Sequence, residues 1–130
     1  MWLMTTEGFI SVVNKGKNAE LPFCLRSRDI KSIENVIDAL CIKRKIWKDA
    51  ATDYEFRIFV SEDELKQYMN HIADNLDYDN FKDAVQKVSP KHAKVYHTLW
   101  FNLLDLGVTV KNFYSRQNKR YVNDVNRLTT

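Results

Sequence analysis

Two histidines in the segment HAKVYHTLW are the side chains best suited to move a proton near neutral pH. His92 and His97 are five residues apart, so on a helix they would point about 140° away from each other and would not share a metal ion. With Lys82 and Tyr96 they are candidates for general acid–base catalysis, which gives one hypothesis: a small hydrolase or nuclease that uses His92 or His97. We expect instead that both imidazoles are hydrogen-bonded structural groups, and that the chain has no catalytic residue.

The stretch DNLDYDNFKD, residues 74–83, is the densest polar cluster. Asp77 and Asp79 alternate as in a calcium loop, but Phe81 occupies the next ligand position and no glycine follows, so we predict no metal site. We expect Asp77 or Asp79 to cap the helix that follows. Three further side chains of this segment are candidates for binding: Tyr78, Asn80 and Lys82.

Cations and aromatic rings are interleaved in the stretches RSR and KRKIWK. Lys43, Arg44 and Lys45 could contact phosphates while Trp47 stacks on a base, and Arg26, Arg28 and Lys48 are further cations of the same candidate group. The alternative is a solvated helix end whose cations favour the negative end of the helix dipole.

Strand patterns precede and separate the helices that would position these residues. TTEGFISVVNK and LPFCLRS are rich in β-branched and aromatic residues, and the turn between them predicts a hairpin. In DYEFRIFV the alternation predicts Tyr54, Phe56, Ile58 and Val60 on one face of a strand. RKIWK is either its hairpin partner or not a strand.

Four helices are predicted from apolar spacing and capping residues. Asp29 caps a helix that ends near Cys41, and Ser61 with Glu64 forms a capping box before a helix that ends near Leu76. A short helix opens at FKDAV, and Ser89 with Pro90 begins a helix over 90–106. Apolar residues surround most of this last helix, so it is central to the core or covered by a partner.

The order of these elements predicts an α+β fold: a small antiparallel sheet of three or four strands with about four helices, in a permuted ferredoxin-like arrangement. We expect one domain over 1–106 and a basic tail over 107–130, either disordered or a short docked helix. The tail has five basic residues and one acidic residue after Gly107, whereas 1–106 has 15 basic and 16 acidic residues.

The composition is that of an ordinary globular protein. No apolar run has the ~20 residues that a membrane span needs, and MWLMTTEGFI lacks the features of a secretory signal, so we expect a cytoplasmic protein with no membrane contact. Cys24 and Cys41 form no CxxC pair, and we expect both to be reduced. No glycine-rich phosphate loop is present, and we expect no cofactor.

Four motifs together resemble a family of small bacterial proteins without a characterised activity: TTxGFxSVV, TDY, DYxNFK and HAxxYHxxW. The resemblance covers most of 1–106 and implies no activity, but it implies where a site would lie. Its polar and aromatic motif positions in this chain include Asp53, Tyr78, Asn80, Lys82 and a histidine, which would form a pocket if the strand entry and the helix corner meet.

The leading hypothesis is a non-catalytic binding or adaptor domain that recognises a protein partner. Nucleic acid is the alternative partner, through the basic tail and the patch 43–48. A homo-oligomer formed through the 90–106 helix is a further expectation.

Overall fold

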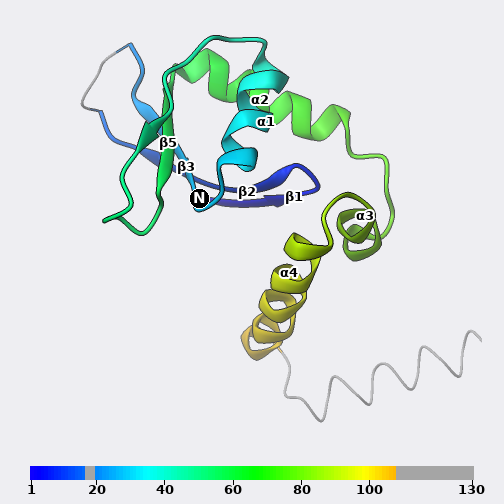
Figure 1. Ribbon diagram of the computed structural model, residues 1–130. Coiled ribbons are helices and arrows are strands. Elements are labelled where there is room, and N and C mark those ends of the chain that lie inside the picture. Colours follow the sequence, from blue (N-terminus) through cyan, green and yellow to red (C-terminus); the bar gives the residue numbers. More distant parts are fainter. Residues whose placement is uncertain (17–19, 108–130) are drawn as a thin grey trace, which may run out of the picture. The chain divides into compact units, whose positions relative to one another are not determined.

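The computed structural model describes residues 1–16 and 20–107. They form ten elements, shown in Figure 1: β1 (Trp2–Thr5), β2 (Gly8–Asn14), β3 (Phe23–Ser27), α1 (Ile30–Leu40), β4 (Trp47–Lys48), β5 (Phe56–Val60), α2 (Glu62–Asp74), α3 (Phe81–Val88), α4 (Pro90–Leu103) and the 3₁₀ turn η1 (Leu104–Leu106). The chain divides into two compact units, Met1–His92 and a second that begins at Ala93. Of the tail predicted over 107–130, residues 108–130 lie outside the described residues.

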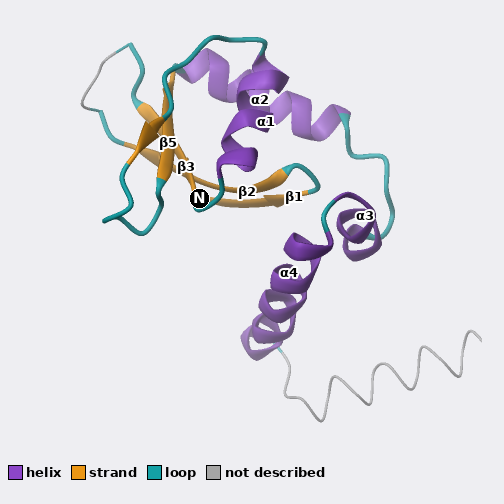
Figure 2. Cartoon of the chain, in the orientation of Figure 1, coloured by secondary structure: helices purple, strands orange, loops and turns teal. Residues whose placement is uncertain are grey.

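The strands form one antiparallel sheet in the order β1-β2-β3-β5-β4. The predicted α+β class is confirmed, and so is the β2–β3 hairpin (Figure 2). β5 lies between β3 and β4, so the crossover through α1 skips one strand. The ferredoxin-like permutation stays a prediction.

The predicted number of three or four strands is wrong because a further strand, β1, precedes the first predicted strand. Residues Trp2–Thr5 pair back on Gly8–Asn14 through a turn at Thr6 and Glu7. Gly8 has a φ of 132°, and a Cβ there would lie 2.0 Å from Ser32 Oγ, so the turn packs directly against α1. Without an Asn-Gly or Asp-Gly signal, TTEG resembles a strand in the sequence. The partner strand predicted in RKIWK is confirmed, but β4 is only Trp47–Lys48.

α1 and α2 cover one face of the sheet (Figure 1). The core between them is aliphatic, with Tyr68 of α2 as its largest side chain: Ile10, Val12, Leu25, Ile33, Val36, Leu40, Ile58, Val60 and Tyr68. Burial of these side chains removes apolar surface from water, which is the main favourable term in folding. Within the described residues, no helix is long and apolar enough to cross a bilayer.

Polar residues begin the helices as the sequence predicts. The Asp29 carboxylate accepts from the Ser32 amide, and Ser61 and Glu64 form the reciprocal capping box of α2. Ser89 Oγ accepts from the His92 amide at 3.3 Å in the first turn of α4. The cap of α3 is a correction: Asn80 rather than Asp77 or Asp79 accepts, from the Asp83 amide at 3.2 Å.

Candidate functional site

The sheet face opposite α1 and α2 carries cations and aromatic rings. Side chains alternate along a strand, so the neighbours of core residues point to this second face. Leu3, Leu25 and Ile58 belong to the core, which places Trp2, Arg26 and Arg57 on the other side.

One row of paired residues crosses this face from edge to edge. The strand register pairs Trp2 with Ser11, Ser11 with Arg26, Arg26 with Arg57, and Arg57 with Trp47, so each of the five strands contributes one residue. We call these five residues the sheet row. Trp2 and Trp47 at its ends are 69% and 48% exposed, whereas Ser11 is buried beneath the longer side chains. The row therefore has a ring at each edge and two guanidinium groups in its centre.

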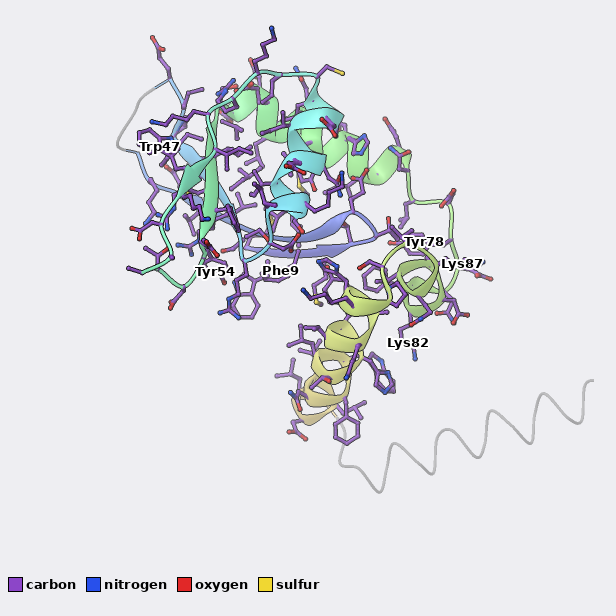
Figure 3. The ribbon with its side chains drawn as sticks, viewed as in Figure 1. Phe9, Trp47, Tyr54, Tyr78, Lys82 and Lys87 are labelled. Carbon is purple, nitrogen blue, oxygen red and sulfur yellow. The ribbon has the colours of Figure 1, made fainter. Side chains whose placement is uncertain are left out.

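Aromatic contacts hold the arginine side of the face in place. The Tyr54 ring stacks on the Phe9 ring with ring centres 6.5 Å apart, and both residues are labelled in Figure 3. The Arg26 guanidinium lies 4.7 Å from the centre of the Tyr54 ring. The predicted face of Tyr54 is therefore wrong: β5 begins only at Phe56, and the alternation does not extend back to Tyr54. The Arg28 guanidinium lies 5.4 Å from the same ring, and its Nε donates to the Asp53 carbonyl at 3.0 Å.

Four cations lie on or beside the sheet row. Within the described residues, Arg26, Arg28, Arg57 and Lys45 form no ion pair with a carboxylate. Arg26 donates from Nε to Ser11 Oγ at 3.1 Å, and Arg57 donates from Nη2 to Thr52 Oγ1 at 2.8 Å. The Lys45 ammonium lies 3.6 Å from the centre of the Trp47 ring. A guanidinium bonded only to neutral oxygens keeps its full positive charge for an external anion.

The predicted patch 43–48 is divided between two roles. Arg44 pairs with Glu64 at 2.6 Å and donates to the Phe59 carbonyl at 2.8 Å, so it fastens this loop to the sheet and to α2. Lys48 pairs with Glu55 at 3.5 Å. Lys43, Lys45 and Trp47 are exposed.

The second predicted group of binding residues lies elsewhere in the same unit. Tyr78 and Lys82 lie at α3, well separated from Trp47 (Figure 3). Tyr78 packs on Phe81 with ring centres 5.8 Å apart, and Asn80 is occupied as the helix cap. Asp53 lies in the loop before β5, where its carbonyl accepts from Arg28. The pocket that the resemblance implies stays a prediction.

His92 joins the beginnings of two helices. Its Nδ1 lies 2.7 Å from Ser89 Oγ, and its Nε2 lies 3.2 Å from Asp29 Oδ2. Burial raises the pKa of the Asp29 carboxyl, but hydrogen bonds from the Ser32 amide, the Ser32 hydroxyl and His92 outweigh burial and leave that pKa below its ordinary value. The arrangement is a hydroxyl, an imidazole and a carboxylate in sequence.

The other candidates for acid–base chemistry are placed differently. His97 is exposed and stacks on Trp100 with ring centres 5.5 Å apart, and Tyr96 is buried. His71 was not among the predicted site residues, and its Nε2 lies 2.9 Å from both carboxylate oxygens of Glu7. Burial raises the pKa of the neighbouring Tyr68 well above its ordinary value, and the negative charge of Glu7 adds to this. Glu7 and His71 are 64 residues apart, so no local spacing signals this pair.

Neither Trp2 nor Arg57 was a predicted site residue. The alternation in DYEFRIFV already separates Arg57 from Phe56 and Ile58, but the sequence does not reveal which residues pair across strands. No protein-family model, no curated protein and no solved structure matches this chain, so the fold and the contacts described above are what a functional proposal has to rest on.

Proposed function

We propose that this chain binds single-stranded nucleic acid on the sheet face that carries the sheet row. The observation that carries the proposal is the row itself: exposed tryptophans at both ends and, in its centre, two arginines that pair with no carboxylate in the part of the chain that the structure describes. Every base has a π-face that stacks on an aromatic ring, and the phosphates are anions that guanidinium groups bind well.

The row favours a single strand over a duplex. In a duplex the base faces are stacked on one another and cannot reach protein rings, whereas a single strand can splay its bases. An acidic protein segment would also satisfy the arginines, and Trp and Arg are enriched at the centres of protein interfaces. A protein partner, the leading expectation from the sequence, is therefore the competing outcome of the test.

The test is a titration of a labelled 20-nucleotide single strand with the full-length chain, followed by fluorescence anisotropy. Trp2→Ala is expected to weaken binding about tenfold, within the range for loss of one base stack. Arg26→Gln is expected to weaken binding and to reduce the slope of log K against log salt by about 0.7, the loss of one phosphate contact.

Lys66→Gln is the matched control, because it removes one positive charge from α2, on the covered side of the sheet, where Lys66 pairs with Glu62. It should leave both the affinity and the salt slope close to those of the unchanged chain. Two results would count against nucleic acid as the ligand. One is displacement of the strand by poly-glutamate at equal charge concentration, and the other is equal affinity of all variants for the strand. Trp2 is largely exposed, so its replacement tests the face without unfolding the core.

One arrangement favours a second function, the hydrolase considered from the sequence. If Nε2–H of His92 donates to Asp29, the Ser89 hydroxyl donates to Nδ1, which is the polarity of a serine-hydrolase relay. Ser89 Oγ would then bond to an ester carbonyl carbon while its proton passes to Nδ1. As the ester C–O bond breaks, Nδ1 would give this proton to the leaving alkoxide, and water would then hydrolyse the acyl group from Ser89. The same contacts serve as helix caps, and capping needs no substrate.

A fluorophosphonate probe separates the two roles of Ser89. A reactive serine gives a covalent adduct at Ser89 that disappears in His92→Gln. An unlabelled Ser89 in the folded, full-length chain would leave His92 and Asp29 with a structural role only.

A further inference from the structure

The sheet row runs at right angles to the strands, because each member is the registered partner of the next. Neighbouring strands lie about 4.8 Å apart, so four steps place Trp2 and Trp47 roughly 19 Å from each other along the row. This separation exceeds what one nucleotide can bridge. A ligand that uses both rings must be a polymer.

The two rings each leave a surface for a base. Trp2 meets Phe9 edge to face, with ring centres 5.9 Å apart and an angle of 68° between planes. Lys45 lies over the Trp47 ring, which keeps a cation beside the base that would stack on the ring's other face. Tyr54, by contrast, is only 9% exposed and is packed between Phe9 and the arginines, so its ring offers no open face to a base.

We infer that the ligand is a stretch of single-stranded nucleic acid that lies across the five strands. One base stacks on Trp2, another on Trp47, and the phosphates between them bind Arg26 and Arg57. At the 3.4 Å rise per nucleotide of a stacked strand, 19 Å corresponds to about six nucleotides, and an extended strand needs fewer. This inference rests on the proposed function and adds the direction and the length of the bound strand.

The test is a length series of oligothymidylates, from (dT)2 to (dT)12, titrated into the full-length ¹⁵N-labelled chain. Of the chain's three indole N–H signals, those of Trp2 and Trp47 report binding at the two rings separately. Affinity should rise steeply up to about six nucleotides and then only slowly. Trp2→Ala and Trp47→Ala should each weaken (dT)10 binding at least tenfold, yet change (dT)2 binding by about twofold, because a dinucleotide uses one ring at a time.

Phe101→Ala is the control, since Phe101 is an exposed aromatic residue of α4 outside the row. It should change binding of neither oligonucleotide. Failure of the inference alone and failure of the proposed function give different results. If only one tryptophan matters, or if both substitutions weaken (dT)2 and (dT)10 by the same factor, the strand does not bridge the row, and the inference fails while nucleic-acid binding stands. If neither oligonucleotide binds, or binding ignores both tryptophans, the proposed function fails as well.

Discussion

The Asp29 carboxylate is the acceptor of several hydrogen bonds at the beginning of α1. Its oxygens accept from the Ser32 amide and hydroxyl at 2.8 Å each, and one of them lies 3.2 Å from His92 Nε2. Asparagine also caps helices well, so Asp29→Asn keeps an acceptor for the Ser32 amide and mainly removes the charge. The substitution therefore isolates the electrostatic part of this cluster.

The stability difference between the original chain and Asp29→Asn should depend on pH in the acid range. The folded pKa of Asp29 is lowered from its ordinary value of 3.8, so the folded state releases the proton more readily than the unfolded state. This contribution is fully present above pH 3.8 and is lost as the pH falls through the lower folded pKa. Urea unfolding between pH 2.5 and 6 would show the difference shrink with acid. Asp38→Asn, at an exposed position of α1, is the control, and a difference that stays constant with pH would contradict the prediction.

α3 provides a test at the scale of an element, because the structure and the sequence assign its cap differently. Asn80→Ala removes the acceptor of the Asp83 amide and should cost about 1 kcal/mol of local helix stability. The amides of α3 should then exchange hydrogen about five times faster in NMR experiments, since 1.4 kcal/mol corresponds to tenfold.

The matched controls are Asp77→Ala and Asp79→Ala, the residues that the sequence favoured. Both are exposed, and neither is the cap of α3. In both control variants the α3 amides should exchange hydrogen at nearly the same rate as in the unchanged chain. Faster exchange in Asp79→Ala than in Asn80→Ala would restore the sequence-based assignment.

The helices were predictable because their signals are local. The cap at Asp29, the capping box of Ser61 and Glu64, and the pair of Ser89 and Pro90 each lie within a few residues of the element that they begin. The sheet row was not predictable, because its five members are joined only by register. Composition drew attention to Trp47 and its basic neighbours, but pairing through β5 is what connects Trp47 to Arg57 and Arg26.

The charge of the whole molecule is uneven, and this bears on what the sheet face contributes. Residues 1–106 are nearly neutral, whereas five basic residues lie beyond Gly107: Lys111, Arg116, Lys119, Arg120 and Arg127. Such a tail attracts polyanions without regard to sequence, so total affinity alone cannot identify the binding face. The informative quantity is the ratio between the affinity of a chain and the affinity of its Trp2→Ala variant.

A full-length chain in which these five residues are changed to glutamine separates the contribution of the tail from that of the sheet face. Its affinity for a 20-nucleotide single strand should fall, and the slope of log K against log salt should decrease by up to about 3.5, or 0.7 for each lost phosphate contact. Trp2→Ala should still weaken binding about tenfold in this background, because effects of distant, independent groups add. Anisotropy titrations from 50 to 300 mM salt measure both quantities. If the neutral tail abolishes the effect of Trp2→Ala, binding belongs to the tail, and the uncompensated arginines of the sheet row need another explanation.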